Sequence, residues 1–215
     1  MKLVVISDTH GQHGALQLPP GDVLLHAGDV SGRGKETEVR DFLQWFGAQP
    51  HPHKIFIAGN HDFYFEKETA ANIQALLPLG VTYLNDSGTT INPAKGGIGG
   101  IHIWGSPITP WFYDWAFNRH RGADIQRHWD LIPTNTDILI THGPVYGILD
   151  QTTRGEKVGC HNLLAKVQAI QPRLCICGHI HEAYGVLEQN GTQFVNASVV
   201  DERYRLVNKP VVVEW

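Results

Sequence analysis

The sequence predicts an α/β fold in which two packed sheets lie between outer helices. Two observations carry this prediction. Short apolar runs rich in Val, Ile and Leu alternate with helical patterns over most of the chain, and the last part changes to strand-like runs joined by turns. The 215 residues, 42% of them hydrophobic, suffice for one buried core, and no linker-like tract, charge block or repeat divides them. We therefore expect a single domain over residues 1–215.

The expected strands are short, apolar and mostly closed by small or polar residues. In order along the chain they are Leu3–Ile6, Val23–Leu25, Lys54–Ala58, Ile101–Trp104, Asp137–Ile140 and Arg173–Cys177. Helices are expected between several of these strands, at Glu36–Phe46, Glu66–Leu77, Ala123–Leu131 and Cys160–Ile170. The first two and the last of these segments have apolar residues spaced by three and four, and the pattern is less clear in Ala123–Leu131. Strands joined by turns are expected at the end: Tyr184–Leu187, Gln193–Asn196 and Val211–Trp215.

Composition narrows the possible partners and location. A net charge of −4, with no basic run, argues against binding of a polymeric nucleic acid through its phosphates. No apolar run approaches the ~20 residues of a membrane span, and Leu3–Ile6 is too short for a signal sequence. We expect Cys160, Cys175 and Cys177 to be buried thiols in a reduced compartment. The sequence thus favours a cytoplasmic protein without a membrane partner, and it leaves the oligomeric state open.

Polar side chains that bind metals follow five of the expected strands, each just past the carboxyl end of its strand. In α/β sheets ligands bind at that edge, so the five clusters can converge on one site. The clusters supply two carboxylates, four imidazoles and one carboxamide: Asp8, His10, Asp29, Asn60, His142, His179 and His181.

The chemistry of this set favours two divalent ions. A mixed nitrogen and oxygen set without thiolate suits Mn, Fe, Ni, Co or Zn, and four histidines argue against Mg or Ca. Seven ligands exceed the needs of one tetrahedral ion and suit a pair that shares one carboxylate. Water held between such ions becomes a hydroxide that attacks phosphorus in line. His61 lies beside Asn60 and is our candidate general acid, with Asp62 as the carboxylate expected to orient it.

In their order, the five clusters resemble the signature of the calcineurin-like metallophosphoesterase superfamily. The matching blocks span residues 8 to 181: Asp8-Thr9-His10, Gly28-Asp29, Gly59-Asn60-His61-Asp62, Thr141-His142-Gly143 and Gly178-His179-Ile180-His181. The resemblance implies a four-layer α/β/β/α sandwich of two mixed sheets. At the carboxyl ends of the strands we expect a dinuclear centre, with Mn as the first candidate among the metals that suit these ligands. The resemblance also implies a proton-donor role for His61.

The same resemblance divides the ligands between the two ions, with Asp29 as the bridge. One ion is implied to be bound by Asp8, His10, Asp29 and His181. The other is implied to be bound by Asp29, Asn60, His142 and His179.

A second resemblance points to a subgroup. The segment from Pro110 to Asn118, with Phe194-Val195-Asn196-Ala197-Ser198, is similar to small cap-less members related to an animal brain-expressed subgroup. It implies a phosphodiesterase that acts on small nucleotides such as cyclic nucleotides. Two other branches are disfavoured. The block Gly28–Gly34 lacks the second Asp of protein serine/threonine phosphatases, and Gly32 stands where purple acid phosphatases carry Tyr.

The aromatic segment after Pro110 supplies the candidate substrate residues, Trp111, Phe112 and Arg119. A nucleobase could stack on the rings, and the guanidinium could hold a phosphate or sugar oxygen. The alternative is a small satellite core beneath a long loop, followed by a solvated turn. For the whole chain, the alternatives to a phosphodiesterase are a phosphomonoesterase of small molecules and a non-catalytic metal-binding interaction module on the same fold.

Overall fold

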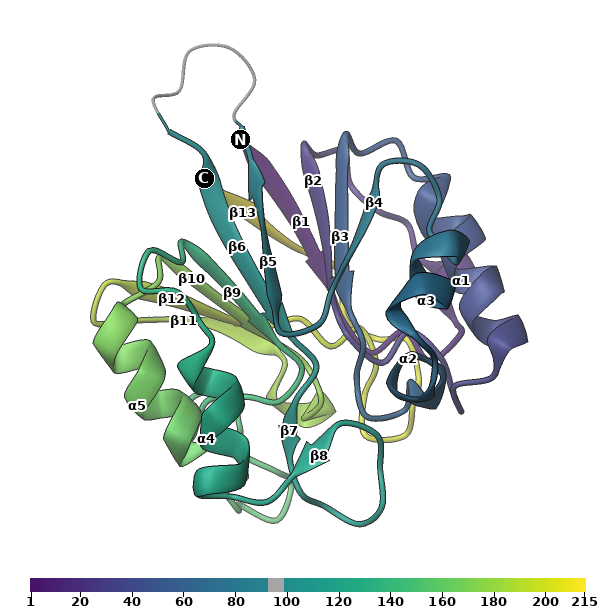
Figure 1. Cartoon of the computed structure of the whole chain (residues 1–215). Coiled ribbons are helices and arrows are strands. Elements are labelled where there is room, and N and C mark those ends of the chain that lie inside the picture. Colours follow the sequence, from purple (N-terminus) through teal and green to yellow (C-terminus); the bar gives the residue numbers. More distant parts are fainter. Residues whose placement is uncertain (93–98) are drawn as a thin grey trace.

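The computed structural model describes residues 1–92 and 99–215, and it has two sheets face to face with helices on both outer faces (Figure 1). Both sheets are mixed, since each combines parallel and antiparallel pairs. The predicted α/β/β/α sandwich of two mixed sheets is confirmed. Three helices cover the first sheet and two cover the second.

The first sheet has five strands in the order β13-β1-β2-β3-β4. Its strands are β1 (Lys2–Ile6), β2 (Val23–Ala27), β3 (His53–Ile57), β4 (Val81–Leu84) and β13 (Val211–Glu214). All neighbours are parallel except β13, which pairs with β1 antiparallel. The outer face carries α1 (Glu36–Gly47), α2 (Phe63–Lys67) and α3 (Ala70–Leu76).

The second sheet has six strands in the order β11-β12-β10-β9-β6-β5. They are β5 (Ser87–Ile91), β6 (Ile101–Ser106), β9 (Ile138–Thr141), β10 (Leu174–Cys177), β11 (Gly185–Gln189) and β12 (Thr192–Asn196). Helices α4 (Ala123–Asp130) and α5 (His161–Ile170) cover its outer face. The remaining elements are short: β7 (Thr109–Pro110), β8 (Asn118–Arg119), η1 (His13–Ala15) and η2 (His181–Ala183).

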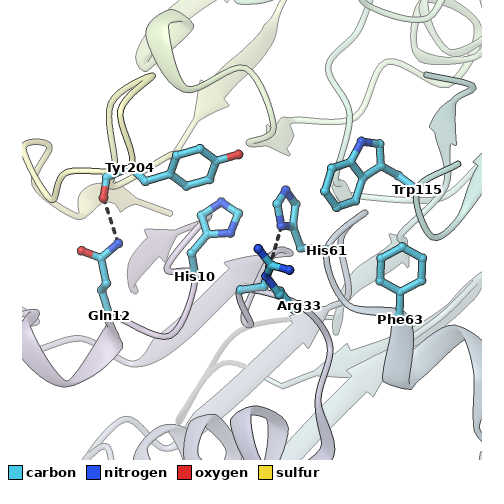
Figure 2. A pocket seen from close by; sticks show the side chains of 8 residues that line it. His10, Gln12, Arg33, His61, Phe63, Trp115 and Tyr204 are labelled. Atoms are coloured by element: carbon cyan, nitrogen blue, oxygen red, sulfur yellow. Dashed lines mark hydrogen bonds between the residues drawn. The ribbon is translucent and has the colours of Figure 1, made fainter. Parts of the chain in front are cut away.

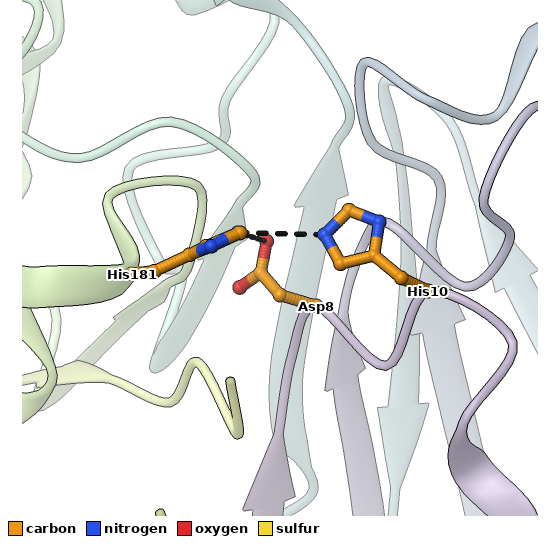
Figure 3. A group of neighbouring side chains, drawn as sticks. All are labelled: Asp8, His10 and His181. Carbon is orange, nitrogen blue, oxygen red and sulfur yellow. Dashed lines mark hydrogen bonds and ion pairs between the residues drawn. The ribbon is translucent and has the colours of Figure 1, made fainter. Parts of the chain in front are cut away.

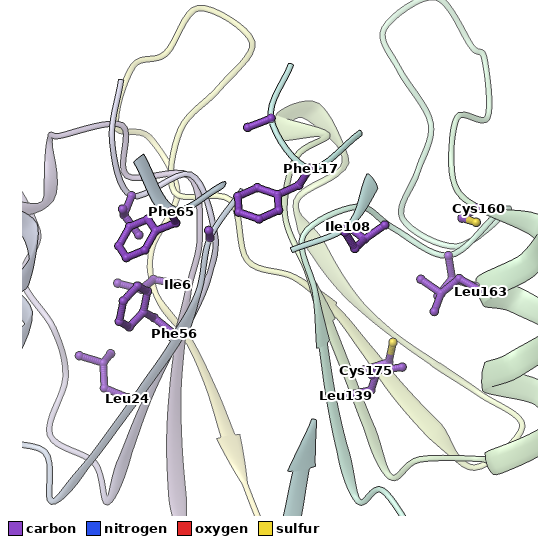
Figure 4. Close-up of a cluster of buried hydrophobic side chains, with 14 of the residues drawn as sticks. Ile6, Leu24, Phe56, Phe65, Ile108, Phe117, Leu139, Cys160, Leu163 and Cys175 are labelled. Carbon is purple, nitrogen blue, oxygen red and sulfur yellow. The ribbon is translucent and has the colours of Figure 1, made fainter. Parts of the chain in front are cut away.

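Alternation along the buried strands divides the core into layers. In β1, Leu3 and Val5 face the cluster between the sheets, whereas Val4 and Ile6 belong to the cluster beneath the helices. Successive side chains of a strand point to opposite faces of the sheet. A strand that is apolar on both faces must therefore be covered on one face by helices and on the other by the second sheet. Figure 4 shows part of the helix-side cluster on both flanks of the sandwich, with Phe117 between them.

Two sequence predictions of secondary structure were wrong or incomplete. The single helix expected over Glu66–Leu77 is two helices, because α2 ends at Lys67 and α3 begins at Ala70. The Thr69 hydroxyl between them accepts a hydrogen bond from the Asn72 N–H (3.2 Å) and caps the second helix. Strands β4 and β5 were not expected, since neither contains an apolar run, and pairing with β3 and β6 holds them in place.

Parallel pairing brings the metal-binding clusters to one edge of the molecule. Strands β1, β2 and β3 run parallel, so the loops after them lie side by side, and β9 and β10 do the same in the second sheet. Backbone hydrogen bonds then join neighbouring loops, from Asp8 N–H to the Gly28 carbonyl (2.9 Å) and from Gly178 N–H to the His142 carbonyl (3.1 Å). The five clusters therefore meet where the two sheets face each other.

Candidate metal centre

One half of the centre is formed by Asp8, His10 and His181, whose side chains converge from loops far apart in the sequence (Figure 3). The two Nε2 atoms of His10 and His181 lie 3.4 Å apart, and His181 Nε2 lies 3.5 Å from Asp8 Oδ1. Both Asp8 oxygens also accept the His179 N–H at 3.1 Å. These residues are three of the four predicted to surround one ion.

The other half gathers around His142, whose side chain is completely buried. Its Nε2 lies 2.9 Å from Asn60 Oδ1 and 3.3 Å from Asp29 Oδ2. The ring of His179 is 5.0 Å from the ring of His142, centroid to centroid. The four side chains predicted to surround the second ion are thus neighbours.

Asp29 lies between the two halves. Its Oδ2 is 3.3 Å from His142 Nε2 and 3.7 Å from His10 Nε2, so one oxygen faces both groups. Its Oδ1 accepts the His61 N–H at 2.8 Å, which holds the carboxylate in that orientation. This is the position that a carboxylate shared between two ions requires.

Hydrogen bonds at the far side of two imidazoles show which nitrogen is free to bind. His142 Nδ1 donates to the Ala27 carbonyl (2.9 Å), and His181 Nδ1 donates to the Asp201 carbonyl (3.1 Å). In the neutral rings both Nε2 atoms therefore present lone pairs. The His142 lone pair faces the oxygens of Asn60 and Asp29, which are acceptors as well. Acceptors that converge in this way need a proton or a metal cation among them, so the residues present fit a divalent metal.

Four of the predicted ligands have a backbone conformation that L-residues rarely adopt. The φ angles of Asp8, His10, Asp29 and His179 lie between 43° and 68°. Each such residue costs on the order of 1–3 kcal/mol and persists where the surrounding structure holds it, often at functional sites. Gly59 adds a steric constraint, because a Cβ at this position would collide with the Asp29 carboxylate and the His142 ring. The loops are therefore shaped around the centre.

Charges within the centre stabilise the two carboxylates, whereas burial keeps two of the imidazoles neutral. Burial alone would raise the pKa of Asp29, but the charge of His142 and its hydrogen bond lower it well below its ordinary value. His181 and His142 lower the pKa of Asp8 in the same way, against the effect of its burial. Burial lowers the pKa of His10 to about 4 and that of His179 to about 3. At neutral pH these two rings are uncharged and ready to coordinate. Burial lowers the pKa of His142, but the charge of Asp29 and its hydrogen bond raise it to about 9, so a metal has to displace a proton from this ring.

His61 lies at the edge of the centre and faces solvent on one side. Its Nδ1 donates to the Gly32 carbonyl (2.9 Å), and its ring stacks on Trp115 with centroids 4.3 Å apart. The His10 ring is 4.6 Å away. One ring nitrogen of His61 also falls within 4.8 Å of donor atoms of His10 and Asp29. The Gly32 contact leaves Nε2 as the nitrogen that can carry a transferable proton.

A cavity of about 530 Å³ opens directly over this edge (Figure 2). Its floor includes His10 and His61, and the aromatic rings of Trp115 and Tyr204 stand on opposite sides. The remaining lining residues are Gln12, Gly32, Arg33 and Phe63. This volume lies within the usual range of small-molecule sites, ~300–1,000 Å³.

The family of the chain is shown by comparison with known proteins. The model of the calcineurin-like phosphoesterase family matches residues 1–183. The chain is 42% identical over 99% of its length to human metallophosphoesterase domain-containing protein 1, of which it covers 70%. The UPF0046 protein K07C11.7 of Caenorhabditis elegans is 36% identical, over 99% of the chain and 74% of its own length. The chain belongs to the calcineurin-like phosphoesterase family.

A solved structure agrees with this assignment at the level of the fold. The phosphopantetheinyl hydrolase of Mycobacterium tuberculosis superposes with a TM-score of 0.64, covering 94% of this chain and 90% of its own, at 16% identity. The protein is thus a metal-dependent phosphoester hydrolase with a dinuclear divalent metal site. In the part of the phosphoesterase that the structure describes, no helix is long and apolar enough to cross a membrane.

The contacts of the Asp62 carboxylate differ from those predicted from the sequence. We expected its carboxylate to orient His61, but the Gly32 carbonyl occupies that place. The Asp62 carboxylate instead accepts the N–H groups of Gly59, Val30 and Ser31 at 2.8, 3.1 and 2.9 Å. It also accepts the Ser31 hydroxyl at 2.6 Å. Asp62 therefore joins the two loops that carry Asp29 and Asn60, and it reaches the chemistry of the phosphoesterase only through them.

The three residues predicted to contact substrate lie outside the cavity that the phosphoesterase forms over His61. Trp111 and Phe112 are half exposed, and Trp111 stacks on His120. The Arg119 guanidinium donates to His128 Nε2 (3.2 Å) and to the Asn118 carbonyl (2.7 Å). Their roles in substrate binding stay predictions.

The two aromatic side chains beside His10 and His61 in the cavity, Trp115 and Tyr204, were not among the predicted substrate residues. Trp115 lies in the predicted aromatic segment, and only the fold shows that it is the ring that reaches His61. Tyr204 lies after the last metal-binding cluster, in a stretch without a motif. Its ring is 4.8 Å from His10 and 5.1 Å from His181, and its φ of 59° marks it as strained. A tyrosine in a polar turn gave no signal in the sequence that could have found it.

Proposed function

We propose that the protein is a phosphodiesterase that hydrolyses small nucleotide or cyclic-nucleotide esters, with Mn as its preferred metal. The observation that carries this proposal is the cavity beside the centre, with Trp115 and Tyr204 on opposite sides and His61 in its floor. Aromatic side chains stack on nucleobases with about 1–3 kcal/mol per base. The space also admits the second ester group that distinguishes a diester from a monoester. Asp8, His10, Asn60, His142, His179 and His181 would hold the two ions, joined through Asp29.

His61 has the contacts of a proton donor to the departing oxygen. When bound, the two ions activate the attacking water and neutralise charge on the phosphoryl oxygens. The Gly32 carbonyl fixes the His61 ring through Nδ1, and Trp115 covers one ring face. Nε2 is left to deliver a proton as the ester bond breaks. Trp115 and Tyr204 limit access to this nitrogen to groups that fit between them.

The test of the proposal is a substrate panel with the purified, metal-loaded protein. The panel compares 2′,3′- and 3′,5′-cyclic nucleotides, nucleoside monophosphates and bis-para-nitrophenyl phosphate, with Mn, Fe, Ni, Co and Zn added separately. We expect turnover of diesters, highest with Mn. Faster turnover of the monophosphates would identify a phosphomonoesterase. Absence of turnover with every metal, in protein shown to be folded, would leave a non-catalytic interaction module.

Asp29→Asn tests whether the two ions depend on one shared carboxylate. We expect the variant to lose metal and activity together, because one oxygen of Asp29 faces both groups of ligands. Metal content is measured by elemental analysis after gel filtration, and activity with the best diester of the panel. Asp130→Asn, an exposed change on α4, is the matched control. Two ions retained by Asp29→Asn would contradict the bridging role.

The location of the protein stays a proposal as well. We propose a reduced, cytoplasmic compartment, supported by Cys160, Cys175 and Cys177, which are buried and unpaired. Burial raises the pKa of Cys175 to about 12, so this thiol stays protonated and unreactive at neutral pH.

A further inference from the structure

A second cavity adjoins the cavity over the metal centre. That second cavity, of about 340 Å³, is lined by Gly34, Tyr64, Lys67 and Glu68 together with Arg33 and Phe63. Arg33 and Phe63 also line the first cavity. The two cavities therefore adjoin at Arg33 and Phe63, and we call them together the groove from His61 to Lys67.

Both basic side chains of this groove are available to a ligand. Among residues 1–92 and 99–215, no carboxylate lies within ion-pair distance of Arg33 or Lys67. The Lys67 ammonium lies over the Phe63 ring, 5.1 Å from its centroid, and both residues line the second cavity. Glu68, the acidic residue of the lining, already accepts a hydrogen bond from Asn72 Nδ2 (2.8 Å).

The loop that carries Arg33 is fixed on both sides of this residue. Gly32 holds His61 through its carbonyl, and the Gly34 N–H donates to Ser31 Oγ (3.0 Å). Gly34 has a φ of 65°, and a Cβ there would collide with the Phe63 backbone. The Arg33 N–H itself donates to Glu38 Oε2 (3.2 Å). The backbone of Arg33 is thus anchored beside the proton donor, as part of the same loop.

The position of Arg33 suits an anionic group on the departing part of the substrate. With His61 as the proposed donor to the oxygen that leaves, the group attached to this oxygen would enter the cavity that His61 and Arg33 both line. Arg33 and His61 line the same cavity, and Lys67 follows at the far end of the groove. A guanidinium matches the geometry of phosphate, and an ammonium adds a point charge. In a protein of net charge −4, two unpaired cations along one groove favour an anion.

We propose that Arg33 and Lys67 form a subsite for a second phosphate group, carried by the leaving group of the ester. This inference rests on the proposed function, since the metal centre must hold the ester phosphate. The substrates would then be nucleotide diesters with a further terminal phosphate, preferred over cyclic nucleotides with a single phosphate.

The test compares two product-like ligands in the metal-loaded protein by calorimetry. Adenosine 5′-monophosphate offers one phosphate, and adenosine 3′,5′-bisphosphate offers two. We expect the bisphosphate to bind about tenfold more tightly, which corresponds to ~1.4 kcal/mol and to one charge-assisted hydrogen bond. Arg33→Gln combined with Lys67→Gln should remove this advantage and leave the affinity for the monophosphate unchanged. Arg127→Gln, an exposed change on α4 outside the groove, should retain it.

Four results would overturn the inference in different ways. An advantage that persists in the double variant would place the second phosphate elsewhere. An equal loss of affinity for both ligands would show that Arg33 contacts the phosphate at the metals. Equal affinity for the monophosphate and the bisphosphate would show that there is no subsite for a second phosphate, and the proposed function would still stand. If neither ligand binds and the substrate panel shows no turnover, the proposed function fails as well.

Discussion

At the scale of single residues, His61 combines a fixed ring with an open nitrogen. Nδ1 is held by the Gly32 carbonyl, and one ring face is covered by Trp115. This is the arrangement of a proton donor, since the ring cannot turn away and Nε2 stays accessible. The neighbouring Asn60, a proposed ligand, is directed inwards, to His142. Asn60 and His61 are consecutive in the sequence, and their side chains are oriented for two different proposed roles, metal binding and proton donation.

His61→Ala is expected to keep both metal ions and to slow the reaction according to the leaving group. Esters with poor leaving groups should slow by about 10²–10⁴-fold, the usual contribution of a positioned acid, and nitrophenyl esters far less. The measurements are the metal content and kcat for a nucleoside diester and a nitrophenyl diester. Loss of both ions from this variant would contradict the assignment and make His61 a ligand.

Asp62 has a structural task that a variant can isolate. Its carboxylate accepts four hydrogen bonds, three of them from backbone N–H groups. In Asp62→Asn an amide NH₂ would replace one carboxylate oxygen and face N–H groups that need an acceptor. A buried donor left without a partner lowers the free energy of unfolding by about 1–3 kcal/mol. We expect that loss in the free energy of unfolding, measured by urea denaturation of the apoprotein. Asp130→Asn should change it by less than about 0.5 kcal/mol.

At the scale of elements, the turn from Asp201 to Arg205 connects a metal ligand to the wall of the cavity. The Asp201 carboxylate accepts the N–H groups of Arg203 and Arg205, each at 2.9 Å, and Arg205 Nε at 2.7 Å. The hydrogen bond from Arg205 holds the pKa of Asp201 at about 2, so the carboxylate is charged at neutral pH. The Asp201 carbonyl holds His181, and the same turn carries Tyr204.

Asp201→Ala should therefore weaken metal binding although no ligand is changed. Loosening the support of a metal-bound histidine commonly lowers affinity by ~10–100-fold. We expect about tenfold for Mn, measured by titration of the apoprotein, and an increase in KM because Tyr204 loses its position. Glu202→Ala in the same turn is the control, since within the described residues its carboxylate pairs with Arg203 (3.6 Å) and with no residue of the centre. Unchanged metal affinity in Asp201→Ala would show that this turn does not support the metal centre.

At the scale of the whole molecule, the metal centre lies between the two sheets. Asp8, Asp29 and Asn60 follow strands of the first sheet, and His142 and His179 follow strands of the second. Ions bound here would tie the sheets together at the edge where their loops meet. We propose that residues 1–215 unfold as one domain, because the sheets share the core between them.

Removal of the metals should lower thermal stability in a single cooperative transition. Ions that bind only the folded state add about 2.7 kcal/mol per site at a concentration of 100 times Kd. Calorimetry with and without a chelator should show one transition that moves to lower temperature on chelation. Asp29→Asn, which is expected to lack metal, should not respond to the chelator. Two separate transitions in the metal-loaded protein would argue against a single domain.

Several features could be predicted from the sequence because they depend on local order. Apolar runs predicted six of the buried strands, and the residues just after them predicted a site at the strand ends. Strands β4 and β5 escaped prediction, since their stability comes from pairing with β3 and β6. The break between α2 and α3 depends on one capping hydroxyl, Thr69, inside an otherwise helical pattern.

What the sequence by itself determined is the reaction class, together with a predicted set of metal-binding residues, because ligand chemistry belongs to the residue types and their order. Only the tertiary structure decided which other side chains meet them. The Gly32 carbonyl, and not the Asp62 carboxylate, accepts the hydrogen bond from the His61 ring. Trp115, and not Trp111, lines the cavity. Tyr204 joins from a turn without a motif. These contacts form across loops of both sheets, and their distances in space follow from strand pairing and not from spacing along the chain.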